Sequence, residues 1–280
     1  MNSLLRRYKR NFIHPYITLL KTFLKLQSFN LKTRDGREYK IRNGNEIYLL
    51  SLNGMNNVDL YLRGETVILN FLGRTLMFDG ALEDGDLSGV FFLEQYAQIK
   101  PAGKVVIDIG ANIGDSAIYF ASRLADRVIG LEPFPQTYEL AKHNVHINNL
   151  DETITILNLA IASDERIVFV DSDAKDTAGK TPLKTIYSPS DKNWTSVPTI
   201  TLDKLFDLYK LSEAILKIDC EGCEFEVIPT LNSEISAKIP CIIMEYHADP
   251  NSIIEKLQSL GYKVSTKKSG KGGILLAKKS

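Results

Sequence analysis

Cysteine is scarce in this sequence, with three residues in 280. Cys220, Cys223 and Cys241 are an odd set without the spacing of a disulfide framework, which argues against a disulfide-stapled secreted domain. Long apolar runs are also lacking near the N-terminus, where Lys21 and Lys25 interrupt the apolar stretches. We therefore expect neither a signal-peptide core nor a membrane span there. These absences predict a soluble protein in a reducing, cytoplasmic location.

An excess of either charge is missing too, because 34 Lys and Arg residues balance 34 Asp and Glu residues. This balance gives no reason to expect a nucleic-acid partner. Acidic residues are nevertheless absent before Asp35, whereas that segment holds several basic ones. The basic N-terminus is either a solvated face, which we favour, or a weak contact with an anionic membrane surface. In the second case, lipid-linked or phosphorylated sugars are natural acceptors.

The N-terminal third of the chain contains several different residue patterns. Residues 4–29 place apolar side chains at mostly helical spacing, interrupted by Pro15, which predicts two short helices. From about 31 to 80, short β-prone runs alternate with turn signals such as residues 43–45, which predicts a small antiparallel sheet. Residues 85–99 return to helical spacing. We predict an accessory region over 1–98 and a second domain over 99–280.

Beyond residue 104, apolar strands alternate with helices, which is the pattern of a doubly wound α/β sheet. The continuous apolar run at 105–109 is typical of a buried parallel strand. A polar segment with several prolines, residues 172–198, predicts a long surface loop. The predicted strands are 105–109, 128–131, 154–161, 166–170, 214–218 and 241–245, the helices are 113–124, 135–147, 201–209, 224–231 and 250–260, and 262–267 with 273–277 form a closing hairpin.

The segment DIGANIG at residues 108–114 joins the first of these strands to its helix. Strand, glycine turn and helix in this order favour a nucleotide-binding loop. A dinucleotide fingerprint would have glycine where this chain has Asn112, and the acidic strand end Asp108 suits cationic S-adenosylmethionine better than a pyrophosphate. We assign Asp108, Gly110, Asn112 and Gly114 to binding S-adenosylmethionine. We also expect Gly110→Val to abolish this binding by filling the space against the adenosine.

Glu132 ends the following strand, 24 residues after Asp108. An acidic side chain at about this distance accepts hydrogen bonds from both ribose hydroxyls in nucleotide-binding sheets. The alternative is an ordinary glycine turn followed by a surface glutamate. Strand, turn, helix and acid in the right order favour the adenosine ligand.

A second acidic cluster lies in LKIDCEGCE at residues 216–224, and the next strand ends near Glu245 and His247. Because the carboxyl ends of parallel strands meet at one sheet edge, we expect Asp219, Glu221, Glu245 and His247 to form the catalytic site. Asp219 also faces the cofactor, and Asp219 or His247 receives the acceptor's proton. A surface or helix-capping His247, and a divalent-metal site built from these four residues, remain alternatives.

Cys220 and Cys223 have CxxC spacing inside the same segment. A zinc site would need four ligands, and Cys241 is the one further cysteine. We therefore interpret the pair as small buried residues that fill the junction between strand and helix.

Four segments together resemble the FkbM family of methyltransferases. The resemblance spans about residues 104–265 and implies a Rossmann-like seven-stranded methyltransferase sheet with helices on both faces. It also implies methyl transfer to an oxygen, often a sugar hydroxyl of a glycan, glycolipid or small metabolite. The segments are VIDIGANIG at 106–114, GLEPFP at 130–135, LKIDCEGCE at 216–224 and EYH at 245–247.

The resemblance also implies where the cofactor lies. The loop over 108–114 matches the family's cofactor loop, and Glu132 matches its ribose ligand. Ala160, at the end of the third strand, lies where such proteins contact adenine. The acceptor is expected to be a small molecule or glycan, and no oligomeric state is predicted. An NAD-dependent oxidoreductase and a non-catalytic S-adenosylmethionine-binding module remain the alternatives.

Overall fold

The computed structural model describes residues 2–24, 28–82, 85–171, 194–269 and 272–279. The chain divides into two compact units, Met1–Glu94 and Gln95–Ser280, whereas the sequence predicts a boundary after residue 98. Among the described residues, no helix combines the length and the apolar character needed to cross a membrane.

The first unit opens with two helices, α1 (Asn2–Asn11) and α2 (Pro15–Phe23), which confirms the prediction for this segment. Pro15 starts α2, where its missing N–H leaves no helical hydrogen bond unmade. A third helix, α3 (Gly44–Leu52), corrects the turn predicted at 43–45. Asn43 is its N-cap, and its side-chain oxygen accepts a hydrogen bond from the backbone N–H of Glu46 at 3.1 Å.

The strands of the first unit form two small antiparallel sheets rather than the single one predicted. They are β1 (Phe29–Lys32), β2 (Glu38–Ile41), β3 (Asp59–Arg63), β4 (Thr66–Phe71) and β5 (Arg74–Phe78). β1 pairs with β2, and β4 lies between β3 and β5.

A buried aromatic group forms part of the core of the first unit. The rings of Phe71 and Phe78 contact Phe91 edge to face, with centroids 5.1 and 5.6 Å apart. Phe91 belongs to a short π-helix, η1 (Ser88–Phe92). The helix predicted over 85–99 is therefore wrong for most of its length.

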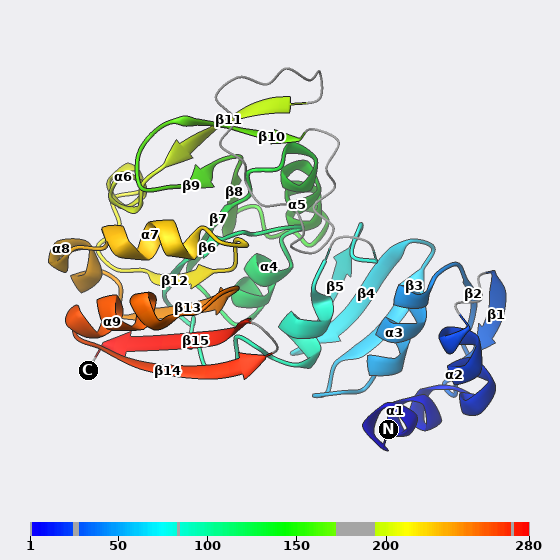
Figure 1. Cartoon of the computed structure of the whole chain (residues 1–280). Helices are drawn as coiled ribbons and strands as arrows, with labels where there is room; N and C mark the ends of the chain where they lie inside the picture. Colours follow the sequence, from blue (N-terminus) through cyan, green and yellow to red (C-terminus); the bar gives the residue numbers. More distant parts are fainter. Residues whose placement is uncertain (1, 25–27, 83–84, 172–193, 270–271, 280) are drawn as a thin grey trace. The chain divides into compact units, whose positions relative to one another are not determined.

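The second unit is built on a seven-stranded sheet (Figure 1). Its strands are β6 (Val105–Ile109), β7 (Arg127–Leu131), β8 (Ile154–Leu157), β12 (Ile215–Ile218), β13 (Cys241–Tyr246), β14 (Tyr262–Ser269) and β15 (Gly272–Lys279). Their order is β14-β15-β13-β12-β6-β7-β8, and all neighbours from β13 to β8 are parallel. The strand order reverses between β6 and β12, which is where α/β sheets bind ligands. The predicted hairpin consists of β14 and β15 and pairs with β13 at one edge of the sheet.

Helices cover both faces of this sheet, as predicted. They are α4 (Asp115–Ser122), α5 (Pro135–Ile147), α6 (Leu202–Leu208), α7 (Glu224–Thr230), α8 (Ser233–Ala237) and α9 (Asn251–Ser259). Ile107 and Ile109 of β6 join a buried cluster with α6, α7 and α9. Asp108 points to the opposite face and meets Ser116 of α4. The fold is therefore of the predicted Rossmann-like α/β class.

A second, three-stranded sheet consists of β9 (Ala160–Ile161), β10 (Ile167–Asp171) and β11 (Trp194–Ile200), with β11 in the middle. The strand predicted over 154–161 is thus divided into β8 and β9. β11 also corrects the loop predicted over 172–198, since residues 194–198 are strand, while 172–193 lie outside the described residues. Val197 is buried and Pro198 is exposed. The alternation of buried and exposed residues that is typical of a strand therefore outweighs the turn signal of Pro198.

Candidate functional site

The carboxyl ends of the central strands bring most of the predicted site residues to one sheet edge. Asp108 lies on β6, and Glu132 directly follows β7. Asp219 directly follows β12, while Glu245 lies on β13 and His247 just beyond it. Because β6 and β12 are neighbours at the point where strand order reverses, the loops after them face a common ligand site.

The loop after β6 is turned by three residues with left-handed backbone, Gly110 (φ 75°), Asn112 (φ 47°) and Gly114 (φ 86°). Asn tolerates this conformation better than most non-glycine residues. A Cβ on Gly110 would overlap the backbone carbonyl of Asp219. Glycine is therefore required where the ends of β6 and β12 approach each other. This is a different reason from the adenosine contact expected from the sequence.

Several backbone N–H groups of this loop are already hydrogen-bonded inside the protein. Gly110 and Ala111 both donate to the carbonyl oxygen of Leu131 at 3.0 Å. Asn112 donates to the carboxylate of Glu132 at 2.9 Å. A pyrophosphate-binding loop directs such groups at its ligand. The geometry therefore disfavours a dinucleotide, and nothing in it supports the oxidoreductase alternative.

Glu132 is almost fully buried, at 2 % exposure, and its carboxylate is held by two backbone groups. Oε2 accepts from Asn112 N and Oε1 from Phe134 N, both at 2.9 Å. One donor belongs to the loop after β6 and the other to the segment after β7. The two bonds orient the carboxylate beside the loop.

Lys217 is a buried charge to which the sequence assigned no role. It lies opposite Asp108 in the register of β12 with β6, and its Nζ is 2.9 Å from Asp108 Oδ1. Nζ also donates to the carbonyl oxygen of Gly110 at 2.6 Å, while Ser116 donates to Asp108 Oδ2 at 2.7 Å. Burial opposes the charge of Lys217, but the carboxylates of Asp108 and Asp219 outweigh it and raise its pKa. The negative charge of Asp108 is therefore balanced inside the protein by Lys217. Lys217 in turn holds the loop through its hydrogen bond to Gly110.

Tyr96 is a second residue that the sequence did not mark as functional. Its hydroxyl donates to Asp219 Oδ2 at 3.1 Å, and its side chain is buried. Burial, and then the charge of Asp219, raise the pKa of Tyr96 well above its usual value. The phenol therefore keeps its proton, and it fixes the carboxylate of Asp219 as an acceptor at the sheet edge.

His247 lies between two carboxylates. Its Nε2 is 3.3 Å from Glu221 Oε2, and its Nδ1 is 3.2 Å from Glu224 Oε1. Hydrogen bonds to Glu221 and then Glu224 raise the pKa of His247 to about 10. At neutral pH it is an imidazolium, which does not suit the base role that the sequence suggested. Of the two predicted bases, this geometry favours Asp219, and it adds the fully buried Glu224 to the cluster.

The distances in this cluster would also allow a metal ion. Ligand atoms of Asp219, Glu245 and His247 all lie within 4.8 Å of one another. Binding a cation through His247 requires an unprotonated ring nitrogen. In the structure, both ring nitrogens of His247 pair with Glu221 and Glu224 in a hydrogen-bonded cluster.

Cys220 and Cys223 form a disulfide, with Cα atoms 5.6 Å apart. Both are partly buried. This corrects their interpretation as small buried residues, because the count of cysteines does not exclude a local pair. Glu221 and Gly222, between them, have left-handed backbone with φ of 55° and 121°. The disulfide therefore closes a tight turn that presents Glu221 to His247.

Ala160, for which the resemblance implies an adenine contact, lies on β9 in the second sheet. It is buried in an apolar cluster with Phe134 and Val197. Asn158 connects this region to the site, because its side-chain amide donates to the backbone carbonyl of Glu132 at 2.9 Å.

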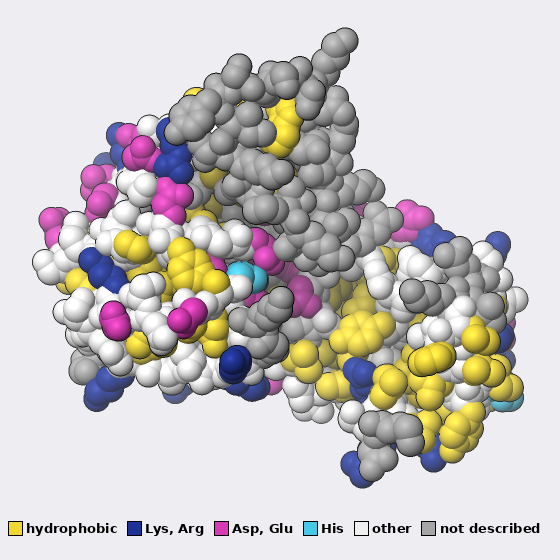
Figure 2. Space-filling model, viewed as in Figure 1, with side chains coloured by type: hydrophobic (Ala, Val, Ile, Leu, Met, Phe, Trp, Pro, Cys, Tyr) yellow, Lys and Arg dark blue, Asp and Glu magenta, His cyan; other side chains and the backbone are white. Residues whose placement is uncertain are grey.

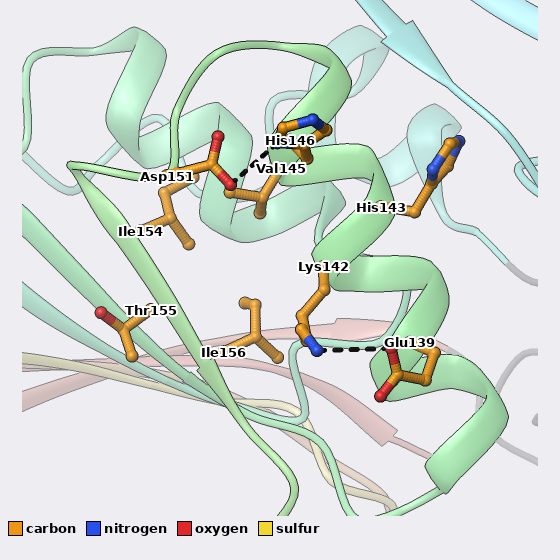
Figure 3. Close-up of a pocket in the computed structure, with 9 residues that line it drawn as sticks. All are labelled: Glu139, Lys142, His143, Val145, His146, Asp151, Ile154, Thr155 and Ile156. Carbon is orange, nitrogen blue, oxygen red and sulfur yellow. Dashed lines mark hydrogen bonds and ion pairs between the residues drawn. The ribbon is translucent and has the colours of Figure 1, made fainter.

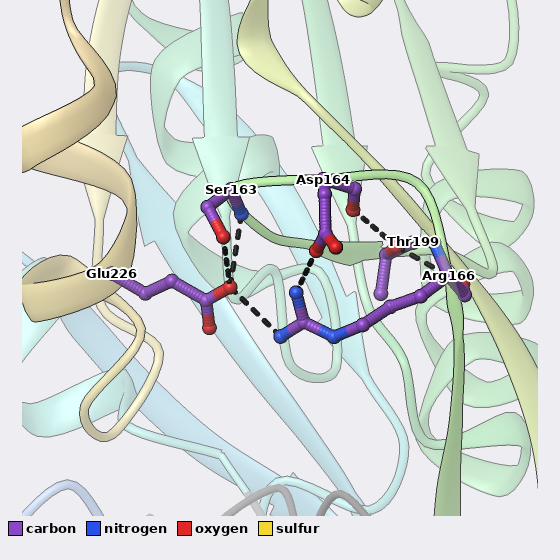
Figure 4. A network of polar contacts seen from close by, with 5 residues as sticks. All are labelled: Ser163, Asp164, Arg166, Thr199 and Glu226. Carbon is purple, nitrogen blue, oxygen red and sulfur yellow. Dashed lines mark hydrogen bonds and ion pairs between the residues drawn. The ribbon is translucent and has the colours of Figure 1, made fainter.

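A polar network joins α7 to the second sheet (Figure 4). One oxygen of Glu226 accepts from Ser163 Oγ at 2.7 Å and from Arg166 at 2.8 Å. Arg166 also pairs with Asp164, and its backbone N–H donates to Thr199 at 2.7 Å. Burial opposes the charge of Glu226, but bonds from Ser163 and Arg166 prevail and lower its pKa. The network anchors the helix that begins directly after the acidic turn.

An open cavity of about 520 Å³ lies between α5 and β8 (Figure 3). Its charged residues pair at the surface, with Lys142 3.3 Å from Glu139 and His146 3.3 Å from Asp151. The cavity is lined by Ile154, Thr155 and Ile156 of β8, and none of the residues of the acidic cluster lines it. The acidic cluster lies at the carboxyl ends, and we assign the chemistry there.

Comparison with known proteins gives a family. The methyltransferase FkbM domain matches residues 108–264, which contain the loop after β6, Glu132 and the cluster around His247. No curated protein matches the sequence.

Solved structures of methyltransferases are similar to this chain at low identity. Methyltransferase FkbM from Methylobacillus flagellatus KT is 16 % identical, with a TM-score of 0.48 over 67 % of this chain and 46 % of that chain. A putative tRNA (m1A22) methyltransferase from Streptococcus pneumoniae is 15 % identical, with a TM-score of 0.42 over 67 % of this chain and 68 % of that chain. The ribosomal protein L11 methylase from Lactobacillus delbrueckii subsp. bulgaricus is 14 % identical, with a TM-score of 0.38 over 66 % of this chain and 74 % of that chain.

Proposed function

The chain belongs to the FkbM methyltransferase family, and we propose that it is an S-adenosylmethionine-dependent O-methyltransferase. Its acceptor would be a sugar hydroxyl of a glycan, glycolipid or small metabolite. The observation that carries this proposal is the position of Asp219. Its carboxylate is fixed by a buried tyrosine at the strand-order reversal, directly beside the loop over 108–114.

The residues around the loop fit a cationic ligand that contains adenosine. Glu132 is oriented for ribose hydroxyls by two backbone donors. Lys217 and Asp108 balance each other, so their pair adds no net charge. The remaining cluster sets the carboxylates of Asp219, Glu221, Glu224 and Glu245 against one imidazolium at His247. This negative edge attracts a sulfonium.

In the proposed reaction, bound S-adenosylmethionine supplies an electrophilic methyl group. Asp219 receives the proton of the acceptor hydroxyl, while Tyr96 holds the carboxylate in place through Oδ2. The protonated His247 orients Glu221 and the buried Glu224. Positioning of this kind contributes about 7 to 11 kcal/mol, and a placed base about 10²- to 10⁴-fold. Most of the rate enhancement would therefore come from positioning.

The proposal is tested with S-adenosylmethionine that carries a labelled methyl group, offered together with glycans and lipid extracts of the host. We expect label to enter a glycan or glycolipid with the wild-type protein. Asp219→Asn should lower turnover at least ~10²-fold, because it removes the proton acceptor. Asp203→Asn, on the exposed side of α6, is the matched control.

Full turnover by Asp219→Asn would refute Asp219 as the base. Cofactor binding without transfer to any fraction would instead favour the non-catalytic binding module.

A further inference from the structure

The helix α2 turns its apolar side outward. Tyr16, Ile17 and Leu20 are each more than half exposed, and Phe23 is 85 % exposed. Leu24, the residue after the helix, is also more than half exposed. Figure 2 shows hydrophobic side chains gathered over the N-terminal helices. An ordinary surface helix buries such residues, so this orientation needs a partner for the exposed side.

The polar side of α2 faces the protein, and a hydrogen bond from Tyr8 of α1 supports this orientation. Thr18 is buried, and its hydroxyl donates to the carbonyl oxygen of His14 at 2.9 Å. The hydroxyl of Thr22 donates to the carbonyl oxygen of Thr18 at 2.8 Å and accepts from the hydroxyl of Tyr8 at 3.2 Å. Turning the apolar residues inward would break the bond to Tyr8. The outward apolar side is therefore a built feature of the fold.

Two lysines lie beside aromatic rings at this apolar side, and no acidic residue precedes Asp35. Lys9 Nζ lies 5.4 Å from the centre of the Tyr16 ring, and Lys21 Nζ lies 4.3 Å from that of Phe29. Both lysines therefore sit beside exposed or half-buried aromatic rings. The basic residues before Asp35 are Arg6, Arg7, Lys9, Arg10, Lys21, Lys25, Lys32 and Arg34.

We propose that this surface docks on a membrane rich in anionic lipids. The membrane face is defined as Ile13, Tyr16, Ile17, Leu20, Phe23 and Leu24. These side chains would insert among the lipids while the basic residues contact the lipid phosphates. With nine residues, α2 is about 14 Å long, so it lies in the membrane plane and does not cross a core of about 30 Å.

A lipid surface fits this face better than a second copy of the chain does. Two copies would bring the lysines beside α2 close to one another, and like charges oppose such contact. An anionic bilayer supplies both the apolar phase and the opposite charge. The proposal does not depend on the methyltransferase assignment, because it concerns residues before Asp35 alone.

The test is cosedimentation of the full chain with phosphatidylcholine vesicles that do or do not contain phosphatidylglycerol. We expect strong binding to the anionic vesicles, weak binding to the neutral ones, and partial release at about 1 M salt, where screening is strong. Leu20→Ser with Phe23→Ser should lower the vesicle partition coefficient at least ~tenfold. Leu208→Ser, an equally exposed apolar residue on α6, should leave it unchanged.

A second variant separates charge from apolar insertion. Lys9→Glu with Arg10→Glu should lower binding to anionic vesicles and leave the weak binding to neutral vesicles unchanged. Circular dichroism of each variant checks that the fold is retained. Absence of vesicle binding by the wild-type chain would overturn the proposal. A concentration-dependent dimer that the Leu20→Ser and Phe23→Ser pair dissociates would also overturn it, because a second copy would then cover the face.

Discussion

At the scale of single residues, the loop over 108–114 depends on side chains whose roles a strand pattern does not reveal. Lys217 interrupts an otherwise apolar strand, and this is the one signal of its role in the sequence. Its partner Asp108 becomes evident when the register of β12 against β6 is known. In the sequence, Tyr96 looks like an ordinary apolar position. Its role becomes evident from the hydrogen bond that its hydroxyl donates to Asp219.

We predict that Lys217→Met destabilises the fold by about 3 to 5 kcal/mol, because it leaves Asp108 charged and buried without its partner. Urea unfolding of the ligand-free protein measures this loss. The double variant Asp108→Asn with Lys217→Met should recover a large part of it. A loss under about 1 kcal/mol in the single variant would show that the pair does not hold the loop.

The raised pKa of His247 predicts a dependence of stability on pH. Its pKa is about 10 in the folded protein against 6.5 for the unperturbed group. Its stabilising contribution is therefore complete below about pH 6.5, declines above it, and is lost as pH rises through about 10. Urea unfolding of wild type and His247→Gln should show a large stability gap near pH 6 that closes near pH 10. A gap that stays constant with pH would contradict the pairing with Glu221 and Glu224.

Gly110→Ala should destabilise the protein in the absence of any ligand, because the new Cβ overlaps the backbone of Asp219. Gly261→Ala is the matched control, since Gly261 also has positive φ but nothing within 4 Å of the added Cβ. The control should lose about 1 to 2 kcal/mol from backbone strain alone, and Gly110→Ala should lose more. Equal losses of stability in the two variants, measured by thermal unfolding, would contradict the view that the close approach of β6 and β12 requires Gly110.

At the scale of elements, periodicity predicted most strands and helices of the second unit, because each buries one face or both. It missed the five-residue helix α8. The prediction failed where a residue typical of turns also occurs in regular structure. Asn43 and Gly44 indicate a turn in the sequence, but Asn43 is the N-cap of α3 and Gly44 is its first residue. Pro198 reads as a loop residue, yet it lies exposed on β11. The disulfide between Cys220 and Cys223 depends on a turn conformation that spacing alone does not define.

The network at Glu226 predicts that α7 is held by its contact with the second sheet. Glu226→Gln weakens the bonds from Ser163 and Arg166 and should cost about 1 kcal/mol, since the side chain is partly exposed. Because the pKa of Glu226 is lowered, the gap from wild type should narrow as pH falls through its folded-state pKa. Glu234→Gln, whose surface contact with Lys238 spans 3.7 Å, should cost little in the same urea unfolding. Equal losses of stability in Glu226→Gln and Glu234→Gln would contradict the anchoring of α7 by this network.

At the scale of the whole molecule, the convergence of the predicted site follows from topology. The carboxyl ends of parallel strands share one edge, so Asp219, Glu245 and His247 could be expected together before any coordinates. The sequence could not show which of them holds a proton. That depends on Glu221 and Glu224, which reach His247 from a turn and a helix N-terminus.

The central claim is that the loop over 108–114 and Glu132 bind S-adenosylmethionine. Isothermal titration calorimetry of the ligand-free chain with S-adenosylmethionine, and separately with NAD, tests it most directly. We predict binding of S-adenosylmethionine at a single site, no heat from NAD, and affinity at least ~tenfold weaker in Glu132→Ala, which loses the ribose contacts. Binding of NAD without S-adenosylmethionine, or wild-type affinity in Glu132→Ala, would contradict the account.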